Sequence, residues 1–551
     1  MSQEIIFNEE AKKKLQAGVN KLSEAVKTSL GPSGMTITIQ KGTGVPKITK
    51  DGVTIAKSIV LSDPVENMGA ALVKDVASKA ADQAGDGTTT ATVLAQAIVN
   101  EGLKNLAAGA NPIEIKKGIN AAVKYVTEFL KANSIEVSDD FEKVKNIATI
   151  SANNDEELGI IIADALSKVK KDGILTVEES KSMETYTQVQ SGMELDKGFI
   201  SPYFCNQKDK QECVLENPVI LFYEKTISQF QSLIPILEMA TRSAEFQGRP
   251  LLIVAENVDG EALTGLVVNK LKGTLKVCAI KAPSYGDAKK DILQDLAILT
   301  GGEVLLVDKG MTLDNMMPQY FGTAEKVIIT KDTTTIINGG GPKEAIENRA
   351  QFIKNQMEET TNDYDKEKLQ QRLAKLVGGV AVVYVGAGSE VELKEKKDRV
   401  DDALCATRAA IQEGIIPGGS VAYIRASLKL NEVKYENEDQ KLGIQIVKNA
   451  LQTPIKVIAN NVGKINGEVV LNEIICTGEK DDWFDYGYDA KNDKYCGMIQ
   501  AGIIDPTKVA RVALENAASV ASMLLTTNCV IFDEKEETPN VNAAMPMMPG
   551  M

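Results

Sequence analysis

The feature that most limits the fold of this chain is a change of pattern that occurs twice along its sequence. The N-terminal part, to about Ala132, and the C-terminal part, from about Lys394, are rich in alanine and repeat apolar residues at helical spacing. Between them, short β-type runs alternate with helical segments, which predicts a parallel sheet covered by helices on both faces. We therefore expect the two ends to fold together around an inserted α/β module; three consecutive domains are the alternative.

The same patterns assign individual elements. An N-terminal helix with Asn8 as its N-cap is predicted from the apolar positions Leu15, Val19, Leu22, Val26 and Leu30. Strands are expected at Met35–Ile39, Pro46–Thr49, Val219–Tyr223, Leu251–Ala255, Leu275–Ile280 and Val304–Val307. Further helices are expected at 67–132 (interrupted by the turn at 85–87), 261–272, 287–300 and 343–376, the last broken near Asn362. Gly192 and Gly378-Gly379 bracket the central module, where a hinge would need permissive backbone.

The absence of histidine excludes several kinds of chemistry. None occurs among the 551 residues, so no Ser-His-Asp triad, no Cys-His pair and no histidine-ligated metal can form. Proton transfer is left to carboxylates, lysines or water, and a bound metal would be a hard cation held by oxygen atoms. The seven cysteines show no CxxC spacing, which favours a reducing compartment over a disulfide framework or a zinc cluster.

Charge and hydropathy narrow the range of partners. The 62 basic and 76 acidic residues give a net charge of −14 without a long basic cluster, so we expect no nucleic-acid partner. No run approaches about 18 uninterrupted apolar residues, so we expect no membrane association. The beginning of the sequence lacks the basic and apolar regions of a signal peptide. A cytoplasmic location is expected.

The strongest local motif is Gly-Asp-Gly-Thr-Thr-Thr at Gly85–Thr90, directly before a clear helical segment. Glycines let the backbone approach an anion, and the N-terminus of a helix supplies free N–H groups. The threonine hydroxyls add donors for phosphate oxygens, and Asp86 can hold a Mg²⁺ ion that neutralises the phosphates. A simple helix N-cap after a turn is the alternative. No Walker A motif occurs, so this is not a P-loop protein.

Other segments carry weaker signals of the same kind. Thr28–Gly34 and Gly414–Gly419 are glycine-rich turns, Lys50-Asp51-Gly52 places a cation beside a carboxylate, and Asp505 precedes the helix-starting Pro506. Asp401 and Asp402 lie in a helical segment, where a solvated face is the ordinary interpretation of charges. Without histidine, however, an aspartate is the natural residue to orient an attacking water.

Taken together, these segments resemble the group I chaperonins, the GroEL type, from about residue 5 to about residue 533. The matching motifs are Thr28–Pro32, Thr49–Val53, Gly85–Thr90, Thr149–Asn153, Lys331–Thr335, Val400–Leu404 and Asp505–Lys508. The resemblance implies a multidomain fold with a mostly α-helical equatorial ATPase domain, a small α/β intermediate hinge domain and an α/β apical substrate-binding domain inserted in the middle of the chain. Their implied boundaries are 1–135 plus 414–551, 136–190 plus 381–413, and 191–380.

The resemblance also assigns residues by motif match. The nucleotide would be contacted by Ser29, Leu30, Gly31, Pro32, Lys50, Asp86, Gly87, Thr88, Thr89, Thr90, Ser151, Gly419, Asp489, Ala490 and Asp505. Asp86 would also hold Mg²⁺. Asp402 would position the hydrolytic water, and Asp51 would help to organise that water or a cation.

The apical match implies an apolar surface for substrate polypeptides. Its residues would be Phe199, Tyr203, Phe204, Ile234, Leu237, Leu263, Val267 and Val268. The residues themselves are compatible with this role, because two predicted helices carry more apolar side chains than one buried face needs, and an exposed excess normally marks a binding site. Unfolded chains expose apolar surface without a common sequence, and a ring of such patches gives multivalent capture.

The implied function is that of an ATP-dependent chaperonin, which captures unfolded polypeptides and uses ATP binding and hydrolysis to encapsulate and release them. The implied cofactors are ATP, Mg²⁺ and K⁺. The implied partners are further copies of the chain in seven-membered rings, single or double, and a co-chaperonin lid of the GroES type. The compartment would be a bacterial cytoplasm, or a host cytoplasm if a virus encodes the chain. A metabolic phosphotransferase and a scaffold with a vestigial nucleotide site are the alternatives from other classes.

Some positions depart from the family pattern. Ser420 stands where a third glycine is usual, and Asp489 stands where asparagine is common. Lys456 and Ile465 occupy the positions of an arginine–glutamate pair that commonly helps to join two rings, with Glu468 just beyond. Lysine lacks the bidentate fork of arginine and isoleucine lacks a carboxylate, which predicts a weaker pairing of rings.

Overall fold

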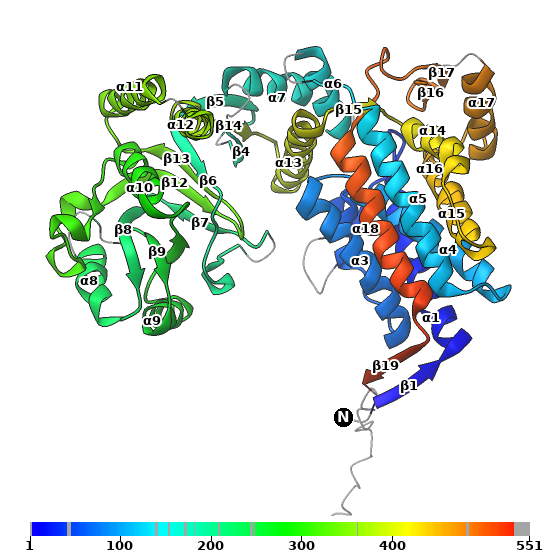
Figure 1. The fold of residues 1–551 in the computed structure, drawn as a ribbon, viewed down its shortest axis with the longest axis horizontal. Coiled ribbons are helices and arrows are strands. Elements are labelled where there is room, and N and C mark those ends of the chain that lie inside the picture. Colours follow the sequence, from blue (N-terminus) through cyan, green and yellow to red (C-terminus); the bar gives the residue numbers. More distant parts are fainter. Residues whose placement is uncertain are drawn as a thin grey trace, which may run out of the picture. The chain divides into compact units, whose positions relative to one another are not determined.

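The chain folds into two compact units. The computed structural model describes residues 3–40, 46–137, 141–152, 155–169, 174–180, 182–207, 210–242, 246, 248–360, 362–480 and 484–533. One unit combines Met1–Ile160 with Ser389–Met551, and the other is Ile161–Gly388 (Figure 1). The prediction that both ends fold together around an inserted α/β module is therefore confirmed, and the alternative of consecutive domains is wrong. The finer division into three domains, with its boundaries, stays a prediction.

The first unit is built around long helices. Its helical core contains α1 (Asn8–Lys27), α3 (Pro64–Ala84), α4 (Thr88–Ala107), α5 (Pro112–Ala132), α15 (Glu438–Leu451) and α18 (Thr507–Thr526). Small residues let these helices approach closely. A Cβ built on Gly18 of α1 would lie 1.8 Å from the carbonyl oxygen of Glu66, and one on Gly69 of α3 would lie 2.1 Å from that of Leu15. The alanine-rich composition of the ends thus reflects tight helix packing.

The two ends of the described chain are hydrogen-bonded to each other. Strand β1 (Gln3–Phe7) pairs antiparallel with β19 (Cys529–Asp533). The predicted N-cap role of Asn8 is wrong, because Phe7 is the N-cap and Asn8 is already the first residue of α1, with φ 56°. Its backbone N–H donates to the carbonyl oxygen of Asn528 at 2.7 Å, so pairing between the termini sets this corner of the chain.

Shorter elements surround the helical core of the first unit. They are β2 (Ile37–Ile39), β3 (Lys47–Thr49), α2 (Gly52–Ser58), α6 (Phe141–Ser151), α13 (Glu390–Glu413), β15 (Ile415–Pro417), α14 (Val421–Lys429), α16 (Thr453–Val462), α17 (Gly467–Lys480), β16 (Tyr486–Asp489), β17 (Lys494–Gly497) and β18 (Ile504–Pro506). Three antiparallel pairs form among the strands, β2 with β3, β15 with β18, and β16 with β17. Most of the loops that the sequence analysis selected join these elements.

The second unit contains a mixed sheet of eight strands. They are β6 (Gly192–Leu195), β7 (Cys213–Glu216), β8 (Val219–Ile227), β9 (Leu251–Val258), β10 (Val277–Lys281), β11 (Val304–Leu305), β12 (Gly322–Ile329) and β13 (Thr334–Gly339). Strands β8, β9, β10 and β11 pair in parallel as predicted, but β12 pairs antiparallel with β13, β7 and β8. The prediction of a purely parallel sheet is therefore wrong. A short turn after Ile329 returns the chain directly as β13, and such a turn can join only antiparallel strands.

Helices flank this sheet, and a smaller sheet lies in the same unit. The helices are α8 (Ile234–Arg242), α9 (Gly260–Leu271), α10 (Gly286–Thr300), α11 (Lys343–Glu359) and α12 (Asp363–Val377). The smaller sheet has the order β4 (Ile174–Glu179), β14 (Val380–Val385), β5 (Tyr186–Gln190), and α7 (Glu156–Val169) precedes it in the chain. Within the described parts of the chain, no helix combines the length and the apolar character that a membrane span requires.

Candidate nucleotide site

One cavity of the first unit brings together every residue that the sequence analysis assigned to nucleotide, cation or water. Its volume is about 590 Å³, within the range usual for ligand pockets. The predicted residues that line it are Ser29, Leu30, Gly31, Pro32, Lys50, Asp51, Asp86, Gly87, Thr88, Thr89, Thr90, Ser151, Asp402, Gly419, Asp489, Ala490 and Asp505. They come from loops and helix ends far apart in sequence, so their convergence is a property of the fold. Their contacts with a nucleotide stay a prediction.

The loop between α3 and α4 forms one end of the cavity. Helix α3 ends at Gly85 with φ 72°, and α4 begins after Gly87 with φ 79°, both in the left-handed region that favours glycine. No side chain caps α4, so the N–H groups of its first turn have no partner from a capping residue. A Cβ built on Gly52 would lie 2.4 Å from the hydroxyl of Thr89, which shows how tightly α2 packs against this loop. The loop therefore presents N–H and hydroxyl donors, within a narrow space, to a bound anion.

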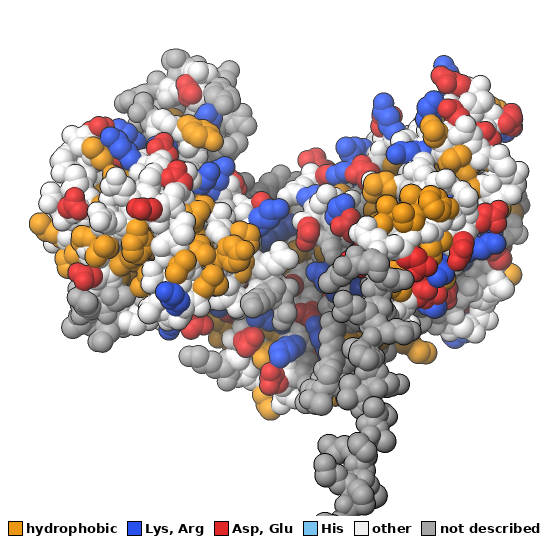
Figure 2. Space-filling view, turned by 90° about the horizontal axis from the view of Figure 1, so that it is seen from below, with side chains coloured by type: hydrophobic (Ala, Val, Ile, Leu, Met, Phe, Trp, Pro, Cys, Tyr) orange, Lys and Arg blue, Asp and Glu red, His pale blue; other side chains and the backbone are white. Residues whose placement is uncertain are grey.

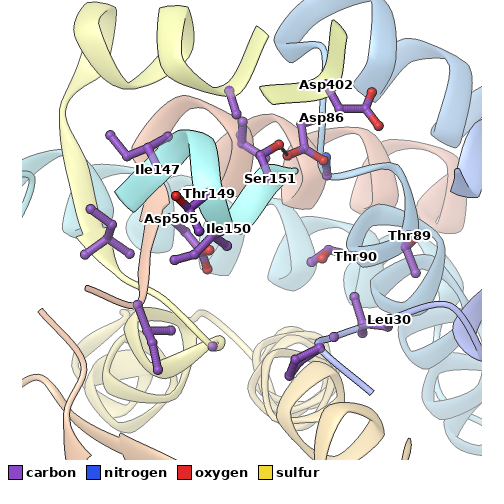
Figure 3. Close-up of a pocket in the computed structure, with 18 of the residues that line it drawn as sticks. Leu30, Asp86, Thr89, Thr90, Ile147, Thr149, Ile150, Ser151, Asp402 and Asp505 are labelled. Atoms are coloured by element: carbon purple, nitrogen blue, oxygen red, sulfur yellow. Dashed lines mark hydrogen bonds between the residues drawn. The ribbon is translucent and has the colours of Figure 1, made fainter. Parts of the chain in front are cut away.

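Asp86 is held in a fixed orientation beside that loop. The Ser151 hydroxyl donates to its Oδ2 at 2.7 Å, and the backbone N–H of Gly87 donates to its Oδ1 at 2.5 Å (Figure 3). Burial nevertheless raises the pKa of Asp86 above its ordinary value, against the lowering effect of these two hydrogen bonds. A carboxylate that is surrounded by protein and only partly compensated is a favourable ligand for a cation.

Asp402 adds a second carboxylate at the same end of the cavity (Figure 3). It projects from α13, and burial raises its pKa well above the ordinary value, with the negative charges of Asp86 and Asp51 contributing next. Asp51 is the N-cap of α2, where its carboxylate accepts from the N–H groups of Val53 (3.1 Å) and Thr54 (2.9 Å). Three aspartates from separate elements thus influence one another across this end of the cavity.

The donor set at this end fits a hard cation that a ligand helps to bind. The oxygens of Asp86 and Asp51 are of the type that Mg²⁺ prefers. Among the described residues, however, no group of three or more acidic or cysteine side chains is arranged to hold a metal ion by itself. A magnesium ion here would need phosphate and water oxygens to complete its shell, which is its usual mode with nucleotides. The residues therefore fit a nucleotide with its cation.

The turn between β15 and α14 also lines the cavity. Ser420 adopts φ 66°, a left-handed conformation at the position where glycine is usual. Its backbone N–H donates to Asp505, yet burial and the charge of Asp86 raise the pKa of Asp505 to about 7. The serine thus takes the backbone shape that the turn requires, at the cost of about 1–2 kcal/mol of strain typical of a non-glycine residue.

Asp489 lies in the cavity wall, but its carboxylate is engaged by its own turn. Oδ1 accepts from the backbone N–H groups of Lys491 (3.0 Å) and Asn492 (3.1 Å), and Oδ2 accepts from the Asn492 side-chain amide (2.7 Å). The buried side chain therefore stabilises the β16–β17 connection. These hydrogen bonds give a structural reason for a carboxylate at position 489, because its two oxygens accept three bonds from the turn.

The sequence analysis missed the apolar part of the cavity, which Ile150, Ile458, Tyr488 and Met498 line. Cβ atoms built on Gly31 and Gly419 would lie 3.2 Å from Ile458 and 2.8 Å from Met498, so these side chains pack against the predicted glycines. Ile150 lies inside a quoted motif, and the alternation of tyrosines at 486 and 488 was a strand signal. Nothing local in the sequence pointed to Ile458 or Met498, because only folding brings them to the cavity.

The comparison with protein families decides the affiliation of the chain. The sequence profile of the TCP-1/cpn60 chaperonin family matches residues 22–535. The chain belongs to the TCP-1/cpn60 chaperonin family. The match spans nearly the whole sequence, so the resemblance to chaperonins drawn from the motifs is confirmed, together with the multidomain fold that it implied.

A solved chaperonin has the same fold. It is the crystal structure of the chaperonin gp146 from the bacteriophage EL 2 (Pseudomonas aeruginosa), in presence of ATP-BeFx. The TM-score is 0.68 over 96% of this chain and 99% of that chain, with 20% sequence identity. At this identity the likeness shows the chaperonin fold and leaves the residue roles to the geometry of this chain.

In the chaperonin's second unit, the predicted substrate-binding residues divide into exposed and buried groups. Tyr203 is 63% exposed, and Ile234 and Val268 are also exposed, whereas Phe199, Leu263 and Val267 are partly buried against the core. Figure 2 shows hydrophobic side chains gathered across this face of the unit at the left. The exposed members lie on or beside η1 (Pro202–Phe204), α8 and α9.

For two residues of this unit, the prediction that they lie on the apolar surface is wrong. Phe204 is completely buried and Leu237 is 8% exposed, and both belong to the hydrophobic core. The reason is local. In η1 the neighbouring side chains of Tyr203 and Phe204 have opposite environments, and in α8 Leu237 belongs with Ile236 and Ala240 to the side of the helix that packs into the hydrophobic core. A patch of apolar sequence cannot by itself show which of its members faces outward. The exposed apolar face of this unit is therefore smaller than the motif match implied.

Proposed function

We propose that this chaperonin is an ATPase that captures unfolded polypeptides on the exposed apolar face of its second unit, and that ATP binding and hydrolysis drive their encapsulation and release. One observation carries the proposal: the phosphate-type loop, the carboxylates of Asp86 and Asp402, which no basic side chain among the described residues is seen to pair, and an apolar wall meet in one cavity. A scaffold with a vestigial site would have no reason to keep these carboxylates close together in a cavity, where their charges repel.

The chain's own residues divide the work of the site. ATP, when bound, supplies the phosphoryl group, and Mg²⁺ neutralises its charge. The first-turn N–H groups of α4 and the hydroxyls of Thr88, Thr89 and Thr90 bind phosphate oxygens. Asp86, oriented by Ser151, holds the cation, and Lys50 adds a positive charge. K⁺ is a further cation in the proposal.

Asp402 is the residue that orients the attacking water. It is the carboxylate on α13 that faces the Asp86 end of the cavity, and the chain has no histidine to take this role. Its raised pKa brings the carboxylate closer to the range in which it can accept a proton from water. Asp51, fixed as the N-cap of α2, helps to organise the same water or a cation.

Capture of clients depends on the exposed apolar residues of each subunit and on the number of subunits in the ring. Tyr203, Ile234 and Val268 present apolar area without sequence-specific hydrogen-bonding geometry, which suits unfolded chains. In a ring of seven subunits several such surfaces act on one client, so weak contacts add to strong capture. The lid of such a chamber would be a co-chaperonin of the GroES type, and the compartment would be the cytoplasm.

Pairing of two rings is proposed to be weak. Lys456 forms an ion pair with Glu468 of the same chain, at 2.8 Å, and Ile465 packs against an apolar cluster of its own unit. The positive charge of Lys456 is therefore paired within its own subunit and is not free to pair with a residue of a second ring. Light scattering should find seven-subunit particles in equilibrium with fourteen-subunit particles, in proportions that change with nucleotide and dilution. A fourteen-subunit particle that persists in every nucleotide state and on dilution would contradict this.

One preparation can test the proposed activity against its rivals. ATP hydrolysis should occur without any small-molecule acceptor, and the same protein should restore activity to a denatured enzyme. A phosphotransferase would need its acceptor for turnover, and a scaffold would not hydrolyse ATP at all. Asp401→Ala is a suitable control, because Asp401 neighbours Asp402 on α13 but does not line the cavity. Normal recovery of the client without ATP would also contradict the proposal.

A further inference from the structure

The turn that follows α1 lines the nucleotide cavity with residues 29–32, and local hydrogen bonds give this turn its shape. The backbone N–H of Gly34 donates to the carbonyl oxygen of Gly31 at 2.9 Å. The N–H of Met35 donates to the carbonyl oxygen of Thr28, also at 2.9 Å. These bonds join residues of the turn to one another, so they fold it without attaching it to the rest of the first unit.

One side chain from a distant helix provides an attachment. The side-chain amide of Asn461, in α16, donates to the carbonyl oxygen of Lys27 at 3.0 Å and to that of Leu30 at 2.9 Å. Carbonyl oxygens can only accept, so the NH2 group of the amide must face both of them. Lys27 is the last residue of α1, where carbonyl groups have no partner within the helix. Asn461 therefore bridges the end of α1 and the segment that lines the cavity.

An apolar contact from the same face of α16 supports this bridge. Ile458 precedes Asn461 by three residues on the helix, so the two side chains are neighbours on its surface. A Cβ built on Gly31 would lie 3.2 Å from Cγ2 of Ile458, and Gly31 has φ 86°, in the left-handed region. The isoleucine thus packs directly on the backbone of the turn. Helix α16 holds the turn through one polar and one apolar side chain.

The neighbouring asparagine of α16 has a different partner. Oδ1 of Asn460 accepts from the backbone N–H of Gly467, the first residue of α17, at 2.9 Å. Asn460 thus acts as an acceptor toward α17, whereas Asn461 acts as a donor toward the turn. The two residues have the same side chain and adjacent positions, so they offer a matched comparison.

We propose that Asn461 is a positioning residue for ATP, whose side-chain amide holds the turn after α1 in the place where the turn binds the nucleotide. This inference rests on the proposed function, because it takes the cavity to be an ATP site. A simple cap on α1 would need only the bond to Lys27, and it is the bond to Leu30 that fixes the cavity wall. Asp402 lies on another helix, α13, so Asn461 acts on binding and leaves hydrolysis to other residues.

Two matched substitutions in the full-length protein test the proposal. Asn461→Asp replaces the donor by a carboxylate that faces two carbonyl oxygens, whereas Asn460→Asp adds the same charge but keeps an acceptor for Gly467. In calorimetry Asn461→Asp should weaken ATP binding by about ten- to a hundredfold, because two hydrogen bonds are replaced by repulsion. Asn460→Asp should change the affinity by less than about threefold, since its charge is exposed. Single-turnover hydrolysis of bound ATP should be nearly the same in both variants.

A measurement without nucleotide tests the attachment itself. Hydrogen–deuterium exchange of the backbone N–H groups in residues 29–35 should be faster in Asn461→Asp than in the unchanged protein, because the turn opens more often. The same groups should exchange at the unchanged rate in Asn460→Asp. Asn461→Ala removes the donor without adding a charge and should show both effects to a smaller degree. It provides the answer if circular dichroism shows that Asn461→Asp does not fold.

The outcomes separate this inference from the proposed function. Equal ATP affinity in Asn461→Asp and Asn460→Asp would overturn the positioning role while leaving the ATP site intact. Unchanged exchange of residues 29–35 in both variants at position 461 would also overturn it, and so would a loss of hydrolysis larger than the loss of affinity. If the unchanged protein does not bind ATP, the proposed function fails and the positioning role fails with it.

Discussion

Both units of the molecule contain aspartates that are shielded from solvent, but the surroundings of these aspartates differ. In the second unit the side chain of Asp295 is 1% exposed and accepts from Arg349 at 2.6 Å and from Arg372. In the first unit Asp86, Asp402 and Asp505 are partly buried in the wall of the cavity, and the charges that raise their pKa values are those of other aspartates. A carboxylate with arginine partners stabilises the structure, whereas an uncompensated one is kept for a ligand or a reaction.

The largest effect should come from the unpaired group on α13. Asp402→Ala is expected to slow ATP hydrolysis by about 10²–10⁴-fold, because positioning of the attacking water is lost, while ATP affinity stays nearly constant. Single-turnover hydrolysis measures the first quantity and calorimetry the second. Asp401→Ala is the matched control. Hydrolysis within a few-fold of the unchanged protein would remove Asp402 from its assigned role.

The paired aspartate should show the opposite behaviour. Asp295→Asn is expected to lower the free energy of unfolding of the second unit by about 3–5 kcal/mol, because Arg349 and Arg372 lose their most deeply buried counter-charge. ATP hydrolysis by the folded fraction should be unchanged. Asp291→Asn is the control, since Asp291 is 45% exposed and binds Arg372 at 2.9 Å, and exposed pairs contribute about 0–1 kcal/mol. Urea unfolding measures both variants. If the two variants lose the same free energy of unfolding, the distinction between the buried and the exposed ion pair is contradicted.

Two neighbouring residues of the second unit separate surface from core. Tyr203→Glu is expected to abolish capture of unfolded protein with little change in stability, because a charge replaces apolar area worth about 1.5–3 kcal/mol per subunit. Phe204→Ala should instead lower the free energy of unfolding by about 3–5 kcal/mol, since it empties a fully buried site. Aggregation of a denatured client and urea unfolding measure the two quantities. Unimpaired capture by the Tyr203 variant would show that clients do not bind at this surface.

A further effect concerns the pH dependence of the first unit. The folded pKa of Asp505 is about 7, above its value in the unfolded chain of about 3.9, so the unfolded state ionises first as pH rises. This group therefore lowers the free energy of unfolding progressively from about pH 4 to about pH 7 and by a constant amount above that range. Asp505→Asn should stabilise the protein more at pH 8 than at pH 5 in urea unfolding. A difference that does not change with pH would contradict the assignment.

Much of the architecture could be predicted because its signals are local. Alanine-rich helical spacing at both ends identified the unit that the ends share, and the Gly85–Thr90 run identified the loop before α4. The mixed sheet was not predictable from the strands themselves. Runs such as Val219–Tyr223 look alike in parallel and antiparallel sheets when both faces are buried, and the turn after Ile329 was the one clue to the antiparallel half.

The candidate site shows the same division between local and non-local information. Glycine, threonine and aspartate in loops indicate a phosphate-binding site, because their backbone and side-chain groups suit phosphate and its cation. Ile458 and Met498 could equally have been core residues. The motif match placed Phe204 and Leu237 at the surface, but both are buried. A motif match gives the position of a residue in the sequence and does not show in which direction its side chain points. The orientation of apolar residues is decided by packing, which a single sequence does not display.

In the proposed function, the cavity of one unit and the apolar face of the other serve one activity. The most direct test measures steady-state ATP hydrolysis with and without a denatured client protein, in the unchanged chain and in Tyr203→Glu. We predict that the client changes the hydrolysis rate of the unchanged chain, and that Tyr203→Glu keeps the basal rate but loses the response. An identical response in both proteins, or hydrolysis that ignores the client altogether, would contradict the claim.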